Sequence, residues 1–237
     1  MSERKPYILK LTGELFEKGN DHISFDRYDL VSKQILETRE NTGAKFVIVV
    51  GAGNIIRGRD ADSKVNPNEA DNMGMLATMI NGVGLRDALT RNGGKGVRLM
   101  TAVEIKGLAE PYIRLKAVSH LEKGYVVVIG FGLGRPGFST DTAVAQYAGE
   151  LECGLILKAS TTDGVYDKDP KKHKDAKKYS ELTFEKALKD DLKIMDANAF
   201  ATSMRTGIPI FVFDVKDLNK MPRAIVEDYS FGTLIHK

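Results

Sequence analysis

The sequence is poor in the residues that build disulfides and metal sites. Its 237 residues include one cysteine, Cys153, which lies in an apolar stretch and cannot form an internal disulfide. We expect a free, structural thiol of this kind in a reducing compartment. The four histidines, His22, His120, His173 and His236, lie far apart and have no histidine or cysteine neighbour at ligand spacing. The composition therefore argues against a built-in zinc site.

Long apolar runs are also missing. No apolar stretch reaches the roughly 20 residues that a helix needs to cross a bilayer. The first ten residues, MSERKPYILK, carry charges where a signal peptide would need its apolar segment. The formal net charge is only +3, and acidic residues interrupt the basic tract at 168–178. We therefore predict a cytoplasmic globular protein with no membrane or nucleic-acid partner, and a solvated loop at this tract.

A third absence is the P-loop sequence G-x-x-x-x-G-K-[ST], the common cradle for a nucleoside triphosphate. The chain instead contains Val- and Ile-rich runs that alternate with longer segments of helical period. This alternation is typical of an α/β protein, in which helices cover a sheet. The length favours one domain, with two small lobes as the alternative. The predicted strands are residues 7–11, 45–50, 97–100, 125–131, 155–158 and 208–213.

Two helices can be predicted together with their ends. Residues 25–42 have an apolar face, with Ser24 placed to cap the start and Gly43 just past the end. Residues 69–91 also show helical periodicity. Apolar residues at helical spacing predict a stripe packed in the core. This stripe consists of Met73, Leu76, Ile80 and Val83.

Four turns of small residues directly follow predicted strands. They are residues 10–14 (KLTGE), 51–54 (GAGN), 130–140 (GFGLGRPGFST) and 159–164 (ASTTDG). In an open α/β sheet the carboxyl ends of the strands form the ligand crevice, where glycine lets backbone N–H groups approach an anion. Lys10 and Lys158 each end a strand there, and fixed cations suit a transferring phosphoryl group. These turns predict phosphate chemistry without a P-loop.

Five carboxylates stand near the predicted element boundaries: Asp71, Asp141, Asp163, Asp169 and Asp196. For each of them the alternative role is that of a helix N-cap or a turn residue. Asp141 and Asp196 each begin a predicted helix. A carboxylate at a helix start beside the phosphates can cap the helix and also orient neighbouring groups.

Taken in order, these motifs resemble those of the bacterial uridylate (UMP) kinases. The matching segments are KLTGE at 10–14, GAGNIIRG at 51–58, ADNMGMLATMINGVGLRDAL at 70–89, FSTDTA at 138–143, LKASTTDGVYDKDP at 157–170 and LKIMDANAF at 192–200. The resemblance covers nearly the whole chain. It implies the amino-acid kinase fold, a three-layer α/β/α sandwich with a mostly parallel sheet. It also implies a single domain over 1–237, with an acceptor-binding part at about 1–150 and an ATP-binding part at about 151–237.

The resemblance further implies a homohexamer that uses Mg-ATP to convert UMP to UDP in pyrimidine biosynthesis, with GTP as activator and UTP as inhibitor. The implied catalytic residues are Lys10, Lys158, Asp141 and Asp196, the aspartates orienting the lysines and Mg²⁺. The implied ATP side comprises Lys10, Leu11, Thr12, Gly13, Gly53, Arg57, Ser160, Tyr166 and Asp169, with Tyr166 against the adenine. The implied UMP side comprises Ala52, Asp71, Leu133, Gly134, Arg135, Pro136, Gly137, Phe138, Ser139 and Thr140, with Asp71 on the ribose hydroxyls.

The chain departs from the family pattern at two places. The family usually reads G-T-G-N-P where residues 132–136 read GLGRP, so Leu133 and Arg135 replace a hydroxyl and an amide. If these side chains face the acceptor base, we expect relaxed selectivity among pyrimidines; if they point away, backbone groups do the recognition. The second departure is Ala52, which stands where glycine is common. Residues 18–23 align with the GTP-effector region too loosely to predict activation.

Three other interpretations remain open. Residues 132–137 satisfy G-x-G-x-x-G and could open an NAD-binding Rossmann unit of an oxidoreductase. Against this, Pro136 removes a backbone donor, and the next strand ends in Lys158 instead of an acid. A pyrimidine-sensing subunit that has lost catalysis would not need all four catalytic charges. Other amino-acid kinases act on carbamate, acetylglutamate, aspartate or isopentenyl phosphate, but DNMGMLAT at 71–78 favours the uridylate branch.

Overall fold

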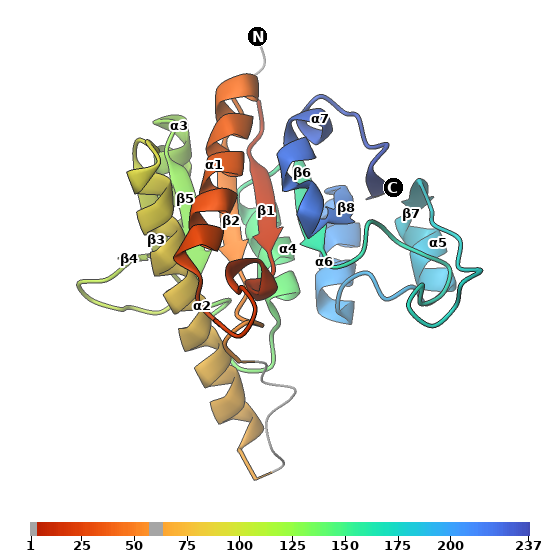
Figure 1. The fold of residues 1–237 in the computed structure, drawn as a ribbon, viewed down its shortest axis with the longest axis horizontal. Helices are drawn as coiled ribbons and strands as arrows, with labels where there is room; N and C mark the ends of the chain where they lie inside the picture. Colours follow the sequence, from red (N-terminus) through yellow and green to blue (C-terminus); the bar gives the residue numbers. More distant parts are fainter. Residues whose placement is uncertain (1–3, 57–63) are drawn as a thin grey trace.

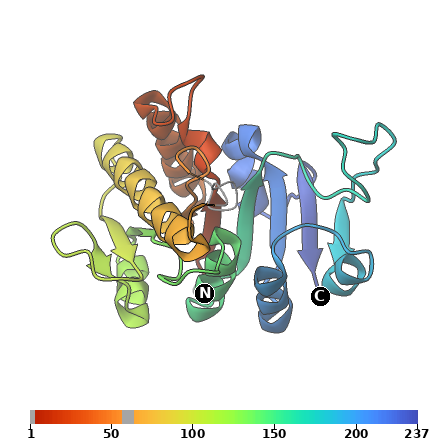
Figure 2. The same ribbon diagram turned by 90° about the horizontal axis from the view of Figure 1, so that it is seen from below.

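A nine-stranded sheet forms the centre of the molecule in the computed structural model, which describes residues 4–56 and 64–237. Helices cover both faces of the sheet (Figures 1 and 2). The strand order is β4-β3-β5-β2-β1-β6-β8-β9-β7, and only the β8–β9 pair is antiparallel. The predicted three-layer α/β/α sandwich with a mostly parallel sheet is therefore confirmed.

The six predicted strands all form, with ends shifted by no more than two residues. They are β1 (Tyr7–Leu11), β2 (Phe46–Val50), β3 (Val97–Thr101), β5 (Val126–Gly130), β6 (Leu155–Ser160) and β8 (Ile210–Asp214). Three strands were not predicted: β4 (Glu110–Pro111), β7 (Glu181–Thr183) and β9 (Gly232–His236). Two of these have only two or three residues, which is too short for an alternating pattern to be recognised.

The core has two parts, one on each face of the sheet. Side chains that alternate along each strand enter opposite layers, so that Leu9 packs on one face and Ile8 on the other. The first face is covered by α1 (Phe25–Thr42), α2 (Pro67–Arg91) and α7 (Met221–Ile225), with the short 3₁₀ segments η1 (Gly13–Phe16) and η3 (Val215–Lys220). The second face is covered by α3 (Arg114–Glu122), α4 (Thr140–Glu150), α5 (Phe184–Lys189) and α6 (Ala197–Thr206). Figure 2 shows these two helical layers on either side of the sheet.

The helix over residues 25–42 has the predicted ends. Gly43 follows it in the left-handed conformation (φ 67°), and its backbone N–H donates to the carbonyl of Arg39. Ser24 occupies the N-cap position, but its side chain makes no capping hydrogen bond. The second predicted helix starts two residues earlier than expected, at Pro67, after an Asn66 cap.

The predicted core stripe of α2 is wrong for three of its four members. Met73, Leu76 and Ile80 are 51%, 54% and 47% exposed. The face of α2 that packs on the sheet instead contains many small residues; at Gly82, an added Cβ would lie 3.0 Å from Leu99 Cδ1. Close contact with the sheet requires a small side chain at points such as Gly82, whereas Met73, Leu76 and Ile80 lie on the outer face of the helix. Among the described residues, no helix combines the length and apolar character that crossing a membrane requires.

Candidate active site

Two lysines and one aspartate meet at the carboxyl ends of the central strands. Lys10 of β1 and Lys158 of β6 are paired positions in the parallel ladder. Asp141, in the first turn of α4, lies between them. Its Oδ2 accepts a hydrogen bond from Lys158 Nζ at 2.5 Å, and its Oδ1 lies 3.6 Å from Lys10 Nζ. The three side chains are only 16%, 9% and 17% exposed for Lys10, Lys158 and Asp141.

This cluster carries one more positive than negative charge in a site of restricted solvent access. Burial would raise the pKa of Asp141, but the ammonium groups of Lys10 and Lys158 outweigh it and hold this pKa below its usual value. Burial lowers the pKa of Lys158, an effect that Asp141 opposes and Lys10 reinforces. An excess cation in a water-poor crevice favours an anionic ligand.

Asp196 connects the starts of two helices. As the N-cap of α6 it accepts hydrogen bonds from the backbone N–H groups of Asn198 and Ala199, both at 3.0 Å. It also accepts from the Thr142 hydroxyl at 2.9 Å and from the Ser139 hydroxyl, and Ser139 itself caps α4. No ion pair joins Asp196 to another residue within 4–56 and 64–237. The capping role considered from the sequence therefore holds for Asp196, whereas α4 is capped by Ser139.

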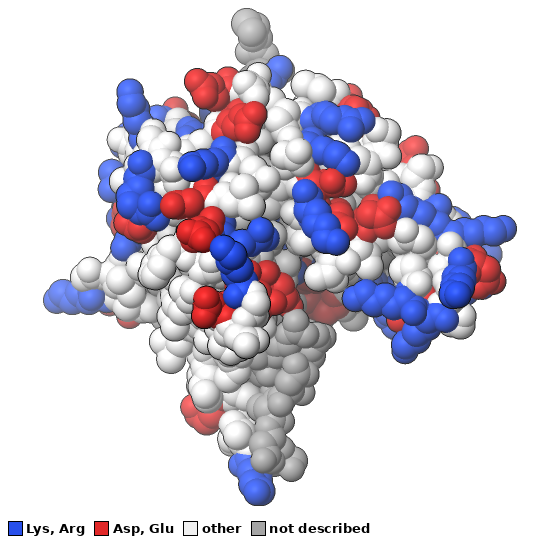
Figure 3. All heavy atoms as spheres, in the orientation of Figure 1, with Lys and Arg blue, Asp and Glu red and all other residues white. Residues whose placement is uncertain are grey.

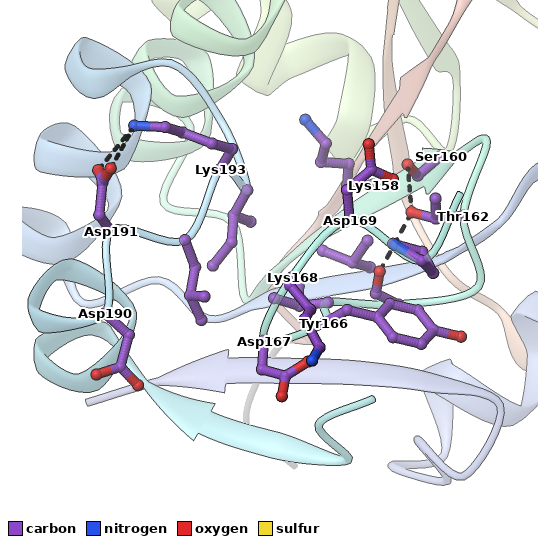
Figure 4. A pocket seen from close by; sticks show the side chains of 16 residues that line it. Lys158, Ser160, Thr162, Tyr166, Asp167, Lys168, Asp169, Asp190, Asp191 and Lys193 are labelled. Atoms are coloured by element: carbon purple, nitrogen blue, oxygen red, sulfur yellow. Dashed lines mark hydrogen bonds and ion pairs between the residues drawn. The ribbon is translucent and has the colours of Figure 1, made fainter. Parts of the chain in front are cut away.

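One cavity of about 390 Å³ opens beside Lys158, between β6 and the loop that follows it (Figure 4). Ser160, Tyr166 and Asp169, which were predicted on the ATP side, all line it. The Tyr166 hydroxyl donates to Asp163 at 2.7 Å, which fixes the orientation of the ring. Lining residues that were not predicted include Thr162, Lys168, Leu192, Ile194 and Val212. The volume falls within the range of ligand pockets.

A second cavity, of about 470 Å³, opens on the Lys10 side of the cluster. Its lining includes six residues that were predicted on the UMP side, Ala52, Asp71, Gly137, Phe138, Ser139 and Thr140, and four that were predicted on the ATP side, Lys10, Thr12, Gly13 and Gly53. Asp71 Oδ2 accepts a hydrogen bond at 2.7 Å from the N–H of Gly137, whose φ of 85° suits glycine. Because Lys10 lines one cavity, Lys158 lines the other and both contact Asp141, the two cavities adjoin at the charged cluster.

A buried polar network holds the glycine turn at residues 51–54. Asn81 of α2 donates to the Gly51 carbonyl at 2.7 Å and to the Asn54 side chain at 2.8 Å. The Tyr28 hydroxyl in turn donates to Asn81 at 2.6 Å. Asn81 is fully buried, so each bond it makes restricts where this turn can lie. Its signal in the sequence is a polar residue inside a helical run, which apolar periodicity does not reveal.

Several predicted residues lie away from the two cavities. The Leu11 side chain is buried in the core, and its carbonyl accepts from the N–H of Gly51. Leu133 is half-buried and packs against the core, and Arg135 is exposed. Neither they nor the neighbouring Gly134 and Pro136 line the second cavity. Arg57 lies outside the described residues.

Comparison with known proteins places these features in a family. Residues 5–214 match the model described as "Amino acid kinase family". The chain belongs to this family. The predicted kinase class is thereby confirmed. An NAD-binding Rossmann unit is not favoured, because the glycine-rich loop at 132–137 belongs to a kinase fold.

Solved structures give a more specific likeness. The UMP kinase of Ureaplasma parvum superposes with a TM-score of 0.92 at 31% identity, over 99% of this chain and 100% of that one. The UMP kinase of Bacillus anthracis gives a TM-score of 0.92 at 36% identity, over 98% of this chain and 96% of that one. The uridylate kinase of Archaeoglobus fulgidus, with a TM-score of 0.73 at 20% identity over 97% and 99%, shares the fold. The predicted resemblance of this amino acid kinase to bacterial UMP kinases is confirmed.

Proposed function

We propose that this chain transfers the γ-phosphoryl group of ATP to UMP and releases ADP and UDP. The observation that carries the proposal is the meeting of two cavities at Lys10, Asp141 and Lys158. ATP would occupy the cavity beside Lys158, and UMP the cavity that contains Asp71. The likeness to two bacterial UMP kinases supports this acceptor over the other substrates of amino acid kinases.

The chemistry needs positioning and charge more than proton transfer. A phosphate oxygen of UMP attacks the γ-phosphorus, and the bond from that phosphorus to the bridging oxygen of ADP breaks. The attacking oxygen is already ionised near neutral pH, so a general base is unnecessary. Lys10 and Lys158 stabilise the charge on the transferring group, and Asp141 holds both ammonium groups in place. The N-termini of α4 and α6, joined by Asp196, add positive potential.

Magnesium would enter with the nucleotide. Within 4–56 and 64–237, no cluster of three or more His, Cys, Asp or Glu residues could hold a metal ion alone. Asp141 Oδ1 is buried and lacks a hydrogen-bond partner among the described residues, so it fits a cation that is also bound by phosphates. Asp196 already accepts four hydrogen bonds and fits less well. When bound, Mg²⁺ would neutralise charge on the phosphate oxygens.

The geometry supports recognition of the base by backbone groups. Leu133 packs against the core and Arg135 is exposed, so neither side chain is directed into the acceptor cavity. Restoring the family residues by Leu133→Thr with Arg135→Asn should therefore leave the ratio of kcat/KM for UMP and CMP unchanged. A change of tenfold or more would assign these side chains to base selection and would contradict this interpretation.

Release of ADP in a coupled assay against a panel of nucleoside monophosphates and small acids tests the function. We expect turnover with UMP, and a fall on the order of 10² or more in Lys10→Ala or Lys158→Ala, by analogy with the loss of an oxyanion donor. Folded protein that forms no UDP at millimolar substrates would refute the proposal. ATP binding without turnover on any acceptor would instead favour the pyrimidine-sensing subunit.

We also propose a cytoplasmic homo-oligomer, with a hexamer as the expected size and GTP and UTP as effectors. The exposed stripe of Met73, Leu76 and Ile80 on α2 supports a contact with a second copy, because an apolar face of this kind gains stability when covered. Ile80→Glu should lower the mass measured by light scattering, whereas Lys33→Glu on the exposed side of α1 should not. An unchanged mass in Ile80→Glu would exclude this stripe as the contact.

A further inference from the structure

The loop between β6 and β7 carries the net charge of the protein. A bridge between Tyr166 and Lys178 closes it, and it projects from the molecule as the teal loop on the right of Figure 1. Its 13 residues, YDKDPKKHKDAKK, include six lysines and three aspartates, a formal charge of +3. The whole chain also carries +3, so the rest of the chain is balanced.

The aspartates of this loop are engaged within it. Asp167 and Asp169 each accept a backbone N–H of the loop through Oδ1, at 2.8 and 2.9 Å. Asp175 pairs with Lys168 at 2.6 Å. Within the loop, the exposed lysines that form no ion pair with any residue of the described ranges are Lys171, Lys174 and Lys177. The carboxylates order the loop, and three ammonium groups remain directed to solvent.

The same loop forms a wall of the first cavity. Residues 166–170 line it, and Lys171 follows directly, its N–H bonded to Asp169. Figure 3 shows basic side chains gathered on the projecting part of the molecule, at the same place as the loop in Figure 1. Unpaired positive charge therefore stands beside the cavity assigned to ATP.

We propose that loop 166–178 is an electrostatic arm that draws the triphosphate of the donor nucleotide toward its cavity. The assignment of the ligand rests on the proposed function. Exposed charges of one sign beside a binding cleft accelerate the association of an opposite charge, by about 10-fold to 10³-fold in strongly steered cases. Salt screens this effect, because the Debye length falls from about 10 Å at 0.1 M to about 3 Å at 1 M. The arm acts on the approach of ATP and leaves the chemical step unaffected.

Stopped-flow binding of a fluorescent ATP analogue tests the arm. The variant combines Lys171→Glu, Lys174→Glu and Lys177→Glu, which reverses the unpaired charges and keeps the aspartate contacts. At low salt we expect its association rate constant to fall about tenfold, and near 1 M salt to match the wild type. The turnover number and the KM for UMP should stay unchanged.

A second triple variant provides the matched control. Lys33→Glu, Lys95→Glu and Lys123→Glu change three exposed lysines outside the loop, on or next to α1, α2 and α3, and alter the net charge equally. Its association rate should fall by less than twofold.

Equal slowing of ATP association in both triple variants, or a wild-type association rate in the loop variant, would refute the steering role of the loop. Either result would leave the proposed function intact. Failure of the wild type to bind any ATP analogue would overturn the proposed function, and the arm with it. Retention of a single-stranded oligonucleotide that the loop variant loses, together with unchanged ATP association, would assign the loop to nucleic acid and refute the proposal.

Discussion

Replacing Asp141 by asparagine removes the negative charge that lies between two lysines and keeps the shape of the side chain. The ammonium of Lys10 lies 3.6 Å from one carboxylate oxygen, and that of Lys158 lies 2.5 Å from the other. At an effective dielectric constant of about 20, these distances correspond to gross attractions of about 5 and about 7 kcal/mol. Much of this is offset by the desolvation of three buried ions.

Removing one partner of a buried ion pair typically costs about 3–5 kcal/mol. Each kcal/mol lowers Tm by about 2–4 °C in a protein of this size, so Asp141→Asn should lose about 6–20 °C. Differential scanning calorimetry of the protein without nucleotide measures this loss. A Tm within about 2 °C of the wild type would refute the view that Asp141 holds the lysines together.

The pH dependence provides an independent check. Burial already lowers the pKa of Lys158, and loss of Asp141 should lower it further. A lysine whose pKa is lowered by folding destabilises the protein below that lowered pKa, and the penalty declines as the pH rises from the lowered value to the value of the unfolded chain. The difference in Tm between wild type and variant should therefore narrow as the pH rises toward the ordinary pKa of lysine, about 10.4. A difference in Tm that stays constant or widens as the pH rises would contradict a lowered Lys158 pKa in the variant.

Three further predictions concern the supporting structure. Tyr28→Phe removes the 2.6 Å bond to Asn81 Oδ1 and leaves that buried oxygen only its 3.2 Å bond from Asn54, so it should cost about 1 kcal/mol in urea unfolding; an unchanged free energy of unfolding would refute this role of Tyr28. Burial raises the pKa of the Cys153 thiol to about 12, so it should resist a thiol reagent at neutral pH until the protein is denatured; rapid native labelling would show that the site opens. Gly13→Ala would make a Cβ overlap the backbone nitrogen of Gly53 at the wall of the second cavity, and we expect folded protein with at least tenfold weaker UMP binding; an unchanged Kd would show that the two turns can separate freely.

The strands and the crevice could be predicted because the relevant signals are local. Lys10 and Lys158 each follow a short apolar run. Parallel strands bring their carboxyl ends to one edge of the sheet, so the two lysines lie together. The contact between Thr142 and Asp196 was beyond the sequence, since it joins residues 54 positions apart on separate helices. No local pattern determines how two helices lie against each other on a sheet.

Helical periodicity also has a limit when both faces of a helix are apolar. In α2 the residues Met75 and Met79 are buried, whereas Met73 and Leu76 are exposed. Both pairs fit a helical spacing, so the pattern alone could not say which face meets the sheet. The small residues on the buried face, such as Gly82, were the better guide.

The two outermost strands of the sheet are unusually short. The sheet ends in β4, which has two residues and includes Pro111, and in β7, which has three. A long open edge offers unpaired N–H and C=O groups to other chains and promotes aggregation. A short edge strand has few such groups, and proline has no N–H to offer. Assembly by edge-to-edge strand pairing is thereby disfavoured, and copies of this protein at high concentration should associate through their helical faces.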